Sequence, residues 1–289
     1  MKRTIIKVFD TLGAFAIGNA VQKAFYRNGF VRVLNYHETP EMSARRFRDQ
    51  CAFYRKHFHP ATPEDLESCI AGSWPHEKPG LVITFDDGFR SNYDTAAGII
   101  EEFGFRGYFF IPVGYIAETR EEADERYMTL AKEGDPEPRM TWDDCLDLAV
   151  RGHRVGAHTR THIRLKDGLT KDVLRDEIRE SGRDIRKRTG LEVKDFCWVG
   201  GEEWSYGLDA YREILAAGYE RSFMTNLLPV TPGTDAHWIQ RTNIESNWPP
   251  EQVRFYLSGL MDLAYLPKRQ RLRRKLAAKE SGARVCSRG

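Results

Sequence analysis

One short stretch in the first third of the chain constrains the fold most. Residues 81–85 are apolar or β-branched, and Asp86, Asp87 and Gly88 follow them directly. This order predicts a buried strand that ends in a sharp turn and holds both acids at its carboxyl end. Two carboxylates this close resist ionising together unless a cation lies between them. The alternative is an ordinary turn at Asp87-Gly88, with Asp86 capping the next helix.

A pair of histidines favours the cation. His158 and His162 lie four residues apart, and a strand is expected to end at the first of them. Two histidines at this spacing can face one metal ion if the turn after the strand is helical. The pair alone is a weak signal. Together with the strand-end carboxylates, it predicts an Asp plus two His metal site with open coordination positions.

Strands alternate with helices along most of the chain. We expect strands near 31–37, 81–85, 107–113, 154–158, 196–199, 221–225 and 238–243, with helices between and after them. Residues 114–139 are charged and irregular, which is typical of a lid or a disordered insert. Right-handed βαβ units build a parallel sheet. Because polar residues end several strands, we expect an α/β fold, a (β/α) barrel of about seven parallel strands.

The two ends of the chain are basic, although its net charge is only +2. Residues 1–30 carry five Lys or Arg and one Asp, and residues 267–289 carry nine Lys or Arg and one Glu. Basic ends on an acidic body argue against nucleic-acid binding by the body and indicate contact of the ends with an anionic surface. We therefore expect an N-terminal helix at 1–30, a catalytic domain at 31–266 and a basic, disordered tail at 267–289.

The N-terminal segment resembles a signal peptide in part, which leaves its cleavage open. Lys7 and Asp10 interrupt its apolar stretch, and they also argue against a membrane-spanning helix. A basic amphipathic helix, lying on a membrane or packed on the body, fits the helical spacing of the apolar residues better. Those residues are Ile5, Val8, Phe9, Leu12, Phe15 and Ala16.

The five cysteines indicate the compartment. Their number is odd and no Cys-x-x-Cys pair occurs, which is typical of reduced thiols in a reducing compartment. We expect a cytoplasmic protein, with peripheral contact with the anionic inner face of the membrane and no nucleic-acid partner.

Four motifs follow one another along the chain, and they are Asn35-Tyr36-His37, Thr84-Phe85-Asp86-Asp87-Gly88, Thr141-Trp142 and His158-Thr159-x-x-His162. In this order they resemble the motifs of the polysaccharide deacetylases, the NodB homology domain of carbohydrate esterase family four. The resemblance extends from about residue 31 to residue 263. It implies a distorted (β/α) barrel, one divalent metal ion, usually zinc, and hydrolysis of an N-acetyl or O-acetyl group on a sugar.

The resemblance also implies roles for individual residues. Asp87, His158 and His162 match the metal ligands of the family, and Asp86 matches its catalytic base. A lone histidine at the end of a strand, such as His37, is more often structural, but the resemblance makes it the candidate general acid.

One family motif is altered in this chain. The family has Arg-x-Pro-Tyr or Tyr-Pro-x-Gly where residues 198–201 are Trp-Val-Gly-Gly, so the arginine and the proline are absent. A backbone N–H of Gly200 or Gly201 can still stabilise an oxyanion, as this loop does in the family. Arg241, on a later strand, is our prediction for the group that supports Asp86.

Three aromatic residues near the altered motif are candidates for stacking on a sugar ring. They are Trp198, Trp204 and Tyr206, and core packing is the alternative for at least one of them.

These inferences predict a hydrolase of non-peptide carbon–nitrogen bonds. The predicted reaction is sugar N-deacetylation in bacterial polysaccharide or glycolipid biosynthesis, with an acetylated sugar, glycolipid or polysaccharide as substrate. A metal hydrolase of another C–N bond, such as a cyclic amide, is one alternative. A catalytically impaired glycan-binding barrel is another. The altered motif favours this second alternative, and the intact Asp-Asp and His-His sets disfavour it.

Overall fold

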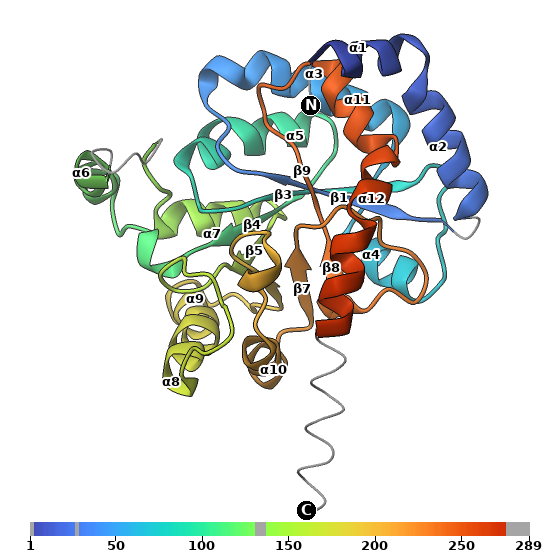
Figure 1. Cartoon of the computed structure of the whole chain (residues 1–289). Helices are drawn as coiled ribbons and strands as arrows, with labels where there is room; N and C mark the ends of the chain where they lie inside the picture. The colour runs from blue at the N-terminus through green and yellow to red at the C-terminus, as the bar shows by residue number, and fades with distance from the viewer. Residues whose placement is uncertain (1–2, 27–28, 131–136, 276–289) are drawn as a thin grey trace, which may run out of the picture.

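The computed structural model describes residues 3–26, 29–130 and 137–275. Parallel strands form a nearly closed barrel with helices around it (Figure 1). The strands are β1 (Val31–Tyr36), β2 (His59–Pro60), β3 (Gly80–Phe85), β4 (Gly107–Ile111), β5 (Arg154–Ala157), β6 (Asp195–Cys197), β7 (Arg221–Met224), β8 (Ile239–Gln240) and β9 (Thr242–Asn243).

The last two strand segments close the ring. The strand order is β8-β7-β6-β5-β4-β3-β1-β9, and β2 pairs with the start of β3 beside this path. Only Arg241 separates β8, which pairs with β7, from β9, which pairs with β1. One short strand therefore joins the two edges of the sheet. The expected α/β barrel of parallel strands is confirmed, with seven strands around the ring in the described part when β8 and β9 are counted as one and β2 is left out.

The local sequence explains the central elements. All residues of β1, β3 and β4 are buried, because a parallel sheet in a barrel is covered on both faces. The helix after β2 starts with a capping box between Thr62 and Asp65, and the helix after residue 140 starts with one between Thr141 and Asp144. Each box satisfies two backbone N–H groups that a helix start leaves free.

Helices follow most of the strands. They are α1 (Arg3–Thr11), α2 (Ala14–Phe25), α3 (Ala44–His57), α4 (Pro63–Ile70), α5 (Gly98–Glu102), α6 (Arg120–Leu130), α7 (Trp142–Val150), α8 (Lys171–Leu174), α9 (Ser181–Thr189), α10 (Leu208–Ala216), α11 (Pro250–Leu257) and α12 (Leu260–Ala264). A π-helical segment, Arg175–Glu180, joins α8 to α9.

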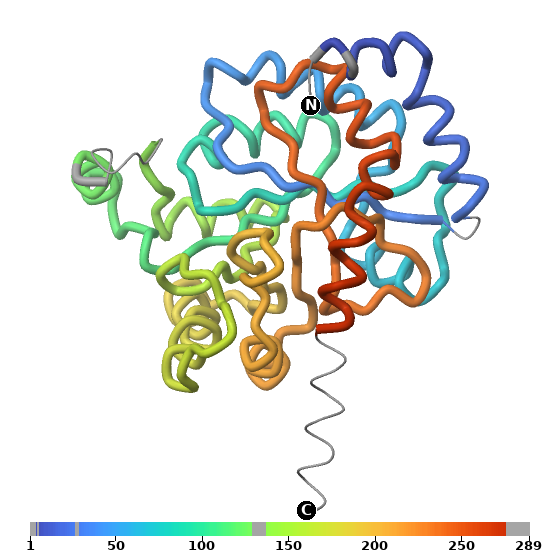
Figure 2. Tube along the Cα trace, viewed as in Figure 1, coloured from blue at the N-terminus to red at the C-terminus, as the bar shows by residue number. Residues whose placement is uncertain are grey.

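The N-terminal segment differs from the single helix that the sequence predicts. It forms two helices, α1 and α2, which pack against α11, so the start of the chain lies beside a helix that comes more than 200 residues later (Figure 2). Asp10 forms an ion pair with Arg254 of α11 at 2.5 Å. Of the predicted apolar face, Phe15 is buried, whereas Leu12 is exposed. The side chain of Ile5 lies outside the described part of the chain. None of the described helices is long and apolar enough to cross a membrane.

The predicted disordered tail is wrong for its first nine residues. Residues 266–275 are helical, and Leu272 in this helix is 1% exposed. The buried guanidinium of Arg269 donates hydrogen bonds to the carbonyl oxygens of Asn226, Leu227 and Asp262. The charge content of this segment alone indicated a solvated tail. The burial of Leu272 and the hydrogen bonds of Arg269 instead hold the segment against the body of the protein. Residues 276–289 lie outside the described part.

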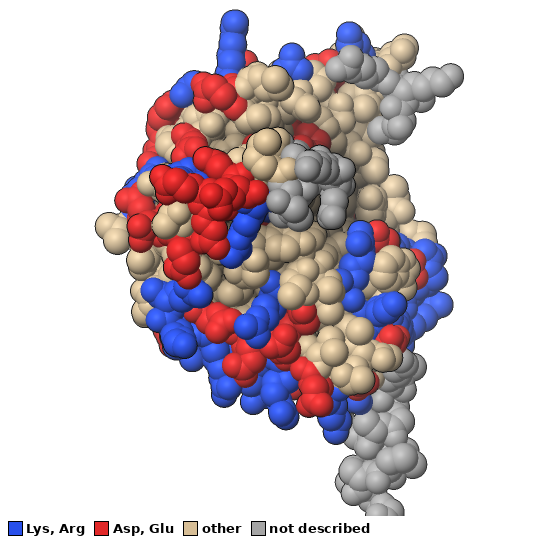
Figure 3. All heavy atoms as spheres, turned by 90° about the vertical axis from the view of Figure 1, so that its left-hand side faces the viewer, with Lys and Arg blue, Asp and Glu red and all other residues tan. Residues whose placement is uncertain are grey.

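The charged insert at 114–139 is partly regular. It contains α6, which lies at the left edge of Figure 1, while residues 131–136 lie outside the described part. Acidic side chains gather on the face of the molecule that α6 helps to form (Figure 3), and α6 contributes Glu121, Glu122 and Asp124 to it.

The docked C-terminal helix leads to a stability prediction. Replacing Leu272 by Ala removes buried apolar contacts and should lower the free energy of unfolding by about 2–4 kcal/mol. Arg274 is exposed on the same helix, so Arg274→Ala should change it by less than about 0.5 kcal/mol. Urea unfolding of the full chain measures both values. Equal values for the two variants would mean that the helix is not docked.

Candidate metal centre and catalytic residues

The end of β3 directs two neighbouring carboxylates to different partners. Asp86 is 3% exposed and Asp87 follows it with φ 69°, in the left-handed region that non-glycine residues rarely adopt. This turn separates the two side chains. The carboxylate of Asp86 contacts Arg241, and that of Asp87 contacts two histidines.

The two histidines meet the same carboxylate oxygen. The Nε2 atom of His158 lies 3.2 Å from Oδ1 of Asp87, and the Nε2 atom of His162 lies 2.9 Å from it. The Nδ1–H of His158 donates to the carbonyl oxygen of Cys197 at 3.0 Å. That hydrogen bond orients the ring and leaves Nε2, which faces Asp87, as the atom that would bind a cation.

The turn between the histidines is not helical, contrary to the condition set from the sequence. Thr159 and His162 have φ 64° and 61°, both left-handed. The buried carboxylate of Glu177 accepts hydrogen bonds from the backbone N–H groups of Arg160 and Thr161, each at 2.9 Å, and from the Thr161 hydroxyl at 2.5 Å. Glu177 thus holds the turn in the shape that brings His162 to Asp87.

The structure places Arg241 against Asp86, as predicted. Its Nη1 and Nη2 donate to the two carboxylate oxygens of Asp86, each at 2.7 Å. Nη1 also donates to Oδ1 of Asn35 at 2.8 Å and to the hydroxyl of Thr84 at 2.9 Å. Nη2 lies 2.9 Å from Sγ of Cys197. Burial raises the pKa of Asp86, but the charge of Arg241 outweighs it, so the pKa stays below the ordinary value.

His37 lies on the neighbouring strand at the same rim of the barrel. Tyr36 of β1 pairs with Phe85 of β3, so the residue after each, His37 and Asp86, lies at the ends of adjacent strands. The charge of His37 contributes to the lowered pKa of Asp86, and it also acts on the half-buried Glu245. His37 is therefore near the candidate base.

The loop after β6 carries the altered family motif. Gly200 has φ 81°, in the left-handed region, where glycine carries no Cβ penalty. The N–H of Gly201 donates to the carboxylate of Glu202 at 3.1 Å. Gly201 therefore already has an acceptor for its N–H, which leaves Gly200 as our candidate for an oxyanion donor.

Two of the three aromatic candidates are core residues. Trp198 and Tyr206 are 2% and 0% exposed, so neither can stack on a sugar, and the prediction of such a role is wrong for both. The hydroxyl of Tyr206 donates to the carbonyl oxygen of Gly200 at 3.4 Å and accepts from the N–H of Thr225 at 3.2 Å. Tyr206 thus supports the loop. Trp204 is 53% exposed and remains the candidate platform.

The donor set of Asp87, His158 and His162 fits a divalent cation. Their ligand atoms lie within 4.8 Å of one another. Two imidazole nitrogens and one carboxylate oxygen suit zinc and leave positions for water and substrate. Burial raises the pKa of Asp87, but hydrogen bonds from His158 and His162 lower it well below the ordinary value, so Asp87 is ionised as a ligand must be.

The chain matches a known family. The sequence pattern described as polysaccharide deacetylase matches residues 74–221. The chain belongs to the polysaccharide deacetylase family. The matched residues include Asp86, Asp87, His158 and His162, whereas His37 and Arg241 lie outside them.

Solved structures share the fold. IcaB from Ammonifex degensii is 20% identical, with a TM-score of 0.63, and the match covers 81% of this chain and 97% of that one. The deacetylase PplD from Streptococcus pyogenes, in complex with acetate, is 17% identical, with a TM-score of 0.62 and coverage of 79% and 98%. A de-N-acetylase from Aggregatibacter actinomycetemcomitans is 13% identical, with a TM-score of 0.63 and coverage of 79% and 100%. The comparison with curated proteins finds no match.

The role of Glu177 in the histidine turn leads to a prediction. Glu177→Gln removes the charge that holds two backbone N–H groups, and should weaken zinc binding at Asp87, His158 and His162 by about 10- to 100-fold, the usual effect of losing a group that orients ligands. Competition with a fluorescent chelator measures this, with His162→Ala as the reference for loss of a ligand. Glu180→Gln, three residues further along, should leave the affinity unchanged. Equal affinities for the Glu177 and Glu180 variants would contradict the proposed role.

Proposed function

We propose that this family member is a metal-dependent sugar N-deacetylase of bacterial polysaccharide or glycolipid biosynthesis. The observation that carries the proposal is the arrangement at the rim of the barrel. Three metal-type ligands converge on one point, and a separate, buried carboxylate held by arginine lies beside them. A glycan-binding barrel without catalysis would not require this second carboxylate.

The two groups of residues have distinct tasks. Asp87, His158 and His162 hold the cation, which supplies Lewis acidity toward a carbonyl oxygen and a water molecule when bound. Asp86 takes the proton of the attacking water. Its bidentate pair with Arg241 keeps it ionised and aims its carboxylate.

The departing amine and the developing oxyanion need their own partners. His37, at the end of the strand next to Asp86, donates a proton to the sugar amine, which is otherwise a poor leaving group. The N–H of Gly200 stabilises the oxyanion, in the place of the loop donor that the family motif provides. Trp204, exposed on the same loop, stacks on the sugar ring.

Acetate release tests this function. Purified, zinc-loaded enzyme should release acetate from at least one class of substrate in a panel of N-acetylated sugars, sugar nucleotides and glycolipids. Asp86→Asn should keep the metal and lose activity by about 10²-fold or more, the scale of a positioned proton-transfer group. Wild-type protein that binds zinc but releases no acetate from the whole panel would favour the glycan-binding alternative. Ammonia or an opened cyclic amide as product would favour the other hydrolase.

The same assay tests His37. His37→Ala should also lose about 10²-fold while zinc binding is unchanged, and the basic limb of its pH–rate profile should be altered. Near-normal turnover of this variant would make His37 structural.

We also propose that the protein works at the cytoplasmic face of the membrane, where it reaches a lipid-linked glycan. Exposed apolar side chains of α2 and α12 line a groove of about 550 Å³, and this is the surface we assign to lipid. These side chains follow one side of α2 and continue onto α12, so they form a continuous apolar stripe. Single apolar residues scattered over a surface would not form one. The most exposed are Leu12, Ile17, Val21, Phe25 and Leu263.

The charges around this groove favour an anionic partner. The acids on α1, α2 and α12 are Asp10 and Asp262, and each is paired with an arginine, Arg254 or Arg32. Lys23 of α2 stays exposed. The groove thus combines apolar side chains with an exposed lysine and with acids whose charge is neutralised by arginine. This combination suits the surface of a membrane that contains anionic lipid.

Vesicle co-sedimentation tests the membrane contact. The triple variant Ile17→Ser, Val21→Ser, Phe25→Ser should lose most of its binding to vesicles that contain anionic lipid, because the three changes remove the apolar anchor. Met42→Ser and Val150→Ser remove even more exposed apolar side chains elsewhere and should bind as wild type does. Wild-type binding should fall at high salt. Equal sedimentation of all variants, or no dependence on anionic lipid, would mean that the groove is not a membrane contact.

A further inference from the structure

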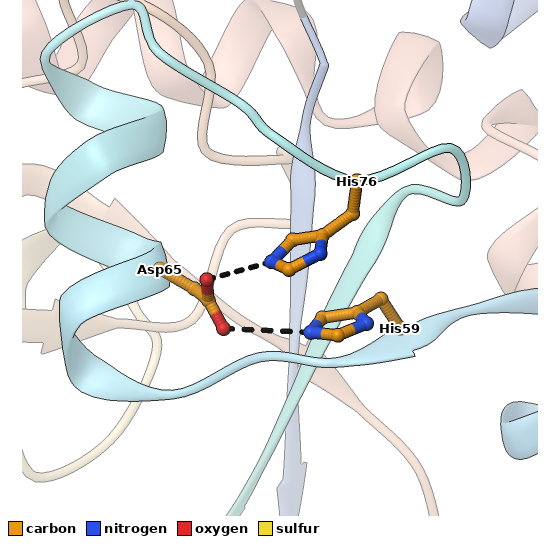
Figure 4. Close-up of side chains that lie close together, drawn as sticks. All are labelled: His59, Asp65 and His76. Atoms are coloured by element: carbon orange, nitrogen blue, oxygen red, sulfur yellow. Dashed lines mark hydrogen bonds and ion pairs between the residues drawn. The ribbon is translucent and has the colours of Figure 1, made fainter.

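A second group of metal-type ligands lies at the opposite end of the barrel. His59 of β2 pairs with Gly80 at the start of β3, whereas Asp86 follows the end of the same strand. At about 3.3 Å per residue, the six steps along the chain from Gly80 to Asp86 place this group roughly 20 Å from the centre described above. Asp65 in the first turn of α4 and His76 in the loop before β3 complete the group (Figure 4).

The two imidazoles point at the two oxygens of one carboxylate. The Nε2 atom of His76 lies 2.8 Å from Oδ1 of Asp65, and the Nε2 atom of His59 lies 3.5 Å from Oδ2. The rings stack with centroids 3.5 Å apart and an angle of 15° between their planes. Both nitrogens therefore lie at the same edge of the stack, facing the acid (Figure 4).

We propose that His59, Asp65 and His76 form a second divalent-cation site, of the chemical class that Zn²⁺ occupies. Two imidazole nitrogens and one carboxylate oxygen are borderline ligands that suit zinc. The ligand atoms lie within 4.8 Å of one another. All three side chains are partly exposed, so the ion can enter from solvent and keep water in its remaining positions.

The surroundings hold Asp65 in place and enclose the two rings before an ion binds. Asp65 is fixed by the capping box, in which its Oδ2 accepts the N–H of Thr62 at 3.0 Å. Trp74 packs edge-on against both rings, with centroids 6.1 Å from His59 and 4.9 Å from His76. The two rings are parallel, so the lone pairs of their Nε2 atoms point in the same direction and do not meet at one point. Binding of one ion therefore requires the rings to turn toward it by rotation about their side-chain torsions.

The three ligands also come from separate parts of the chain. A cation would then replace hydrogen bonds that already join three separate segments. Those segments are β2, the start of α4 and the loop before β3, and a bound ion would fasten them together beneath the barrel.

Zinc stoichiometry of the full chain tests the site. Metal-free protein is dialysed against Zn²⁺ alone, and bound zinc is counted by elemental analysis. Wild type should bind two ions per chain, and His59→Phe, His76→Phe should bind one, because phenylalanine keeps the stacked rings but removes the nitrogens. The matched variant His158→Ala, His162→Ala should also bind one, and the combination of all four changes should bind none.

Thermal unfolding provides the second measurement. Zinc should raise the melting temperature of His158→Ala, His162→Ala protein, and adding His76→Phe should abolish this rise. His237→Gln, which removes an imidazole away from both groups, should leave it unchanged. If His59→Phe, His76→Phe binds as many ions as wild type, the three residues are only a hydrogen-bonded cluster and the proposal is overturned. If zinc is absent only from the site of Asp87, His158 and His162, the result contradicts the metal centre of the proposed function and not this second site.

Discussion

The buried ion pair between Arg241 and Asp86 is the interaction on which the rest of the site depends. Removing one partner of such a pair leaves an uncompensated buried charge, at a cost of about 3–5 kcal/mol. Arg241 also lies between β8 and β9, the two halves of the strand that closes the barrel. Closure of the sheet and support of the candidate base therefore rest on the same residue.

The residues that local sequence could place are those at the ends of strands. Apolar runs followed by polar residues predicted β3 with Asp86 and Asp87, and β5 with His158, because the carboxyl ends of parallel strands meet at one rim. Arg241, which we expected to support Asp86, also lies against it. The strand-end predictions need only the period of the strands, whereas that of Arg241 also used the resemblance to the family, whose motif lacks its arginine in this chain.

The remaining features depend on contacts between distant segments, which residue type does not specify. Trp198 and Tyr206 have the chemistry of a sugar platform and equally that of a core, and only their burial distinguishes the two roles. Glu177 lies in a helix rich in charges, and nothing in its local pattern marks it as the residue that holds the histidine turn. Residues 267–275 have the composition of a tail, yet Leu272 is buried. Composition describes a segment by itself, whereas docking depends on the surface it meets.

The docked C-terminal helix also explains how the altered motif can keep a defined shape. Proline restricts φ of its own residue, so a loop that has glycines instead gains conformational freedom, and contacts must remove that freedom. The hydroxyl of Tyr206 donates to the carbonyl oxygen of Gly200, and the amine of Lys268 donates to that of Gly201. Lys268 belongs to the helix at 266–275, which also ends against the backbone of Tyr206 through Lys275. In the family motif, the proline restrains the backbone of the loop from within the loop. Here much of that restraint comes from a helix more than sixty residues away in the sequence.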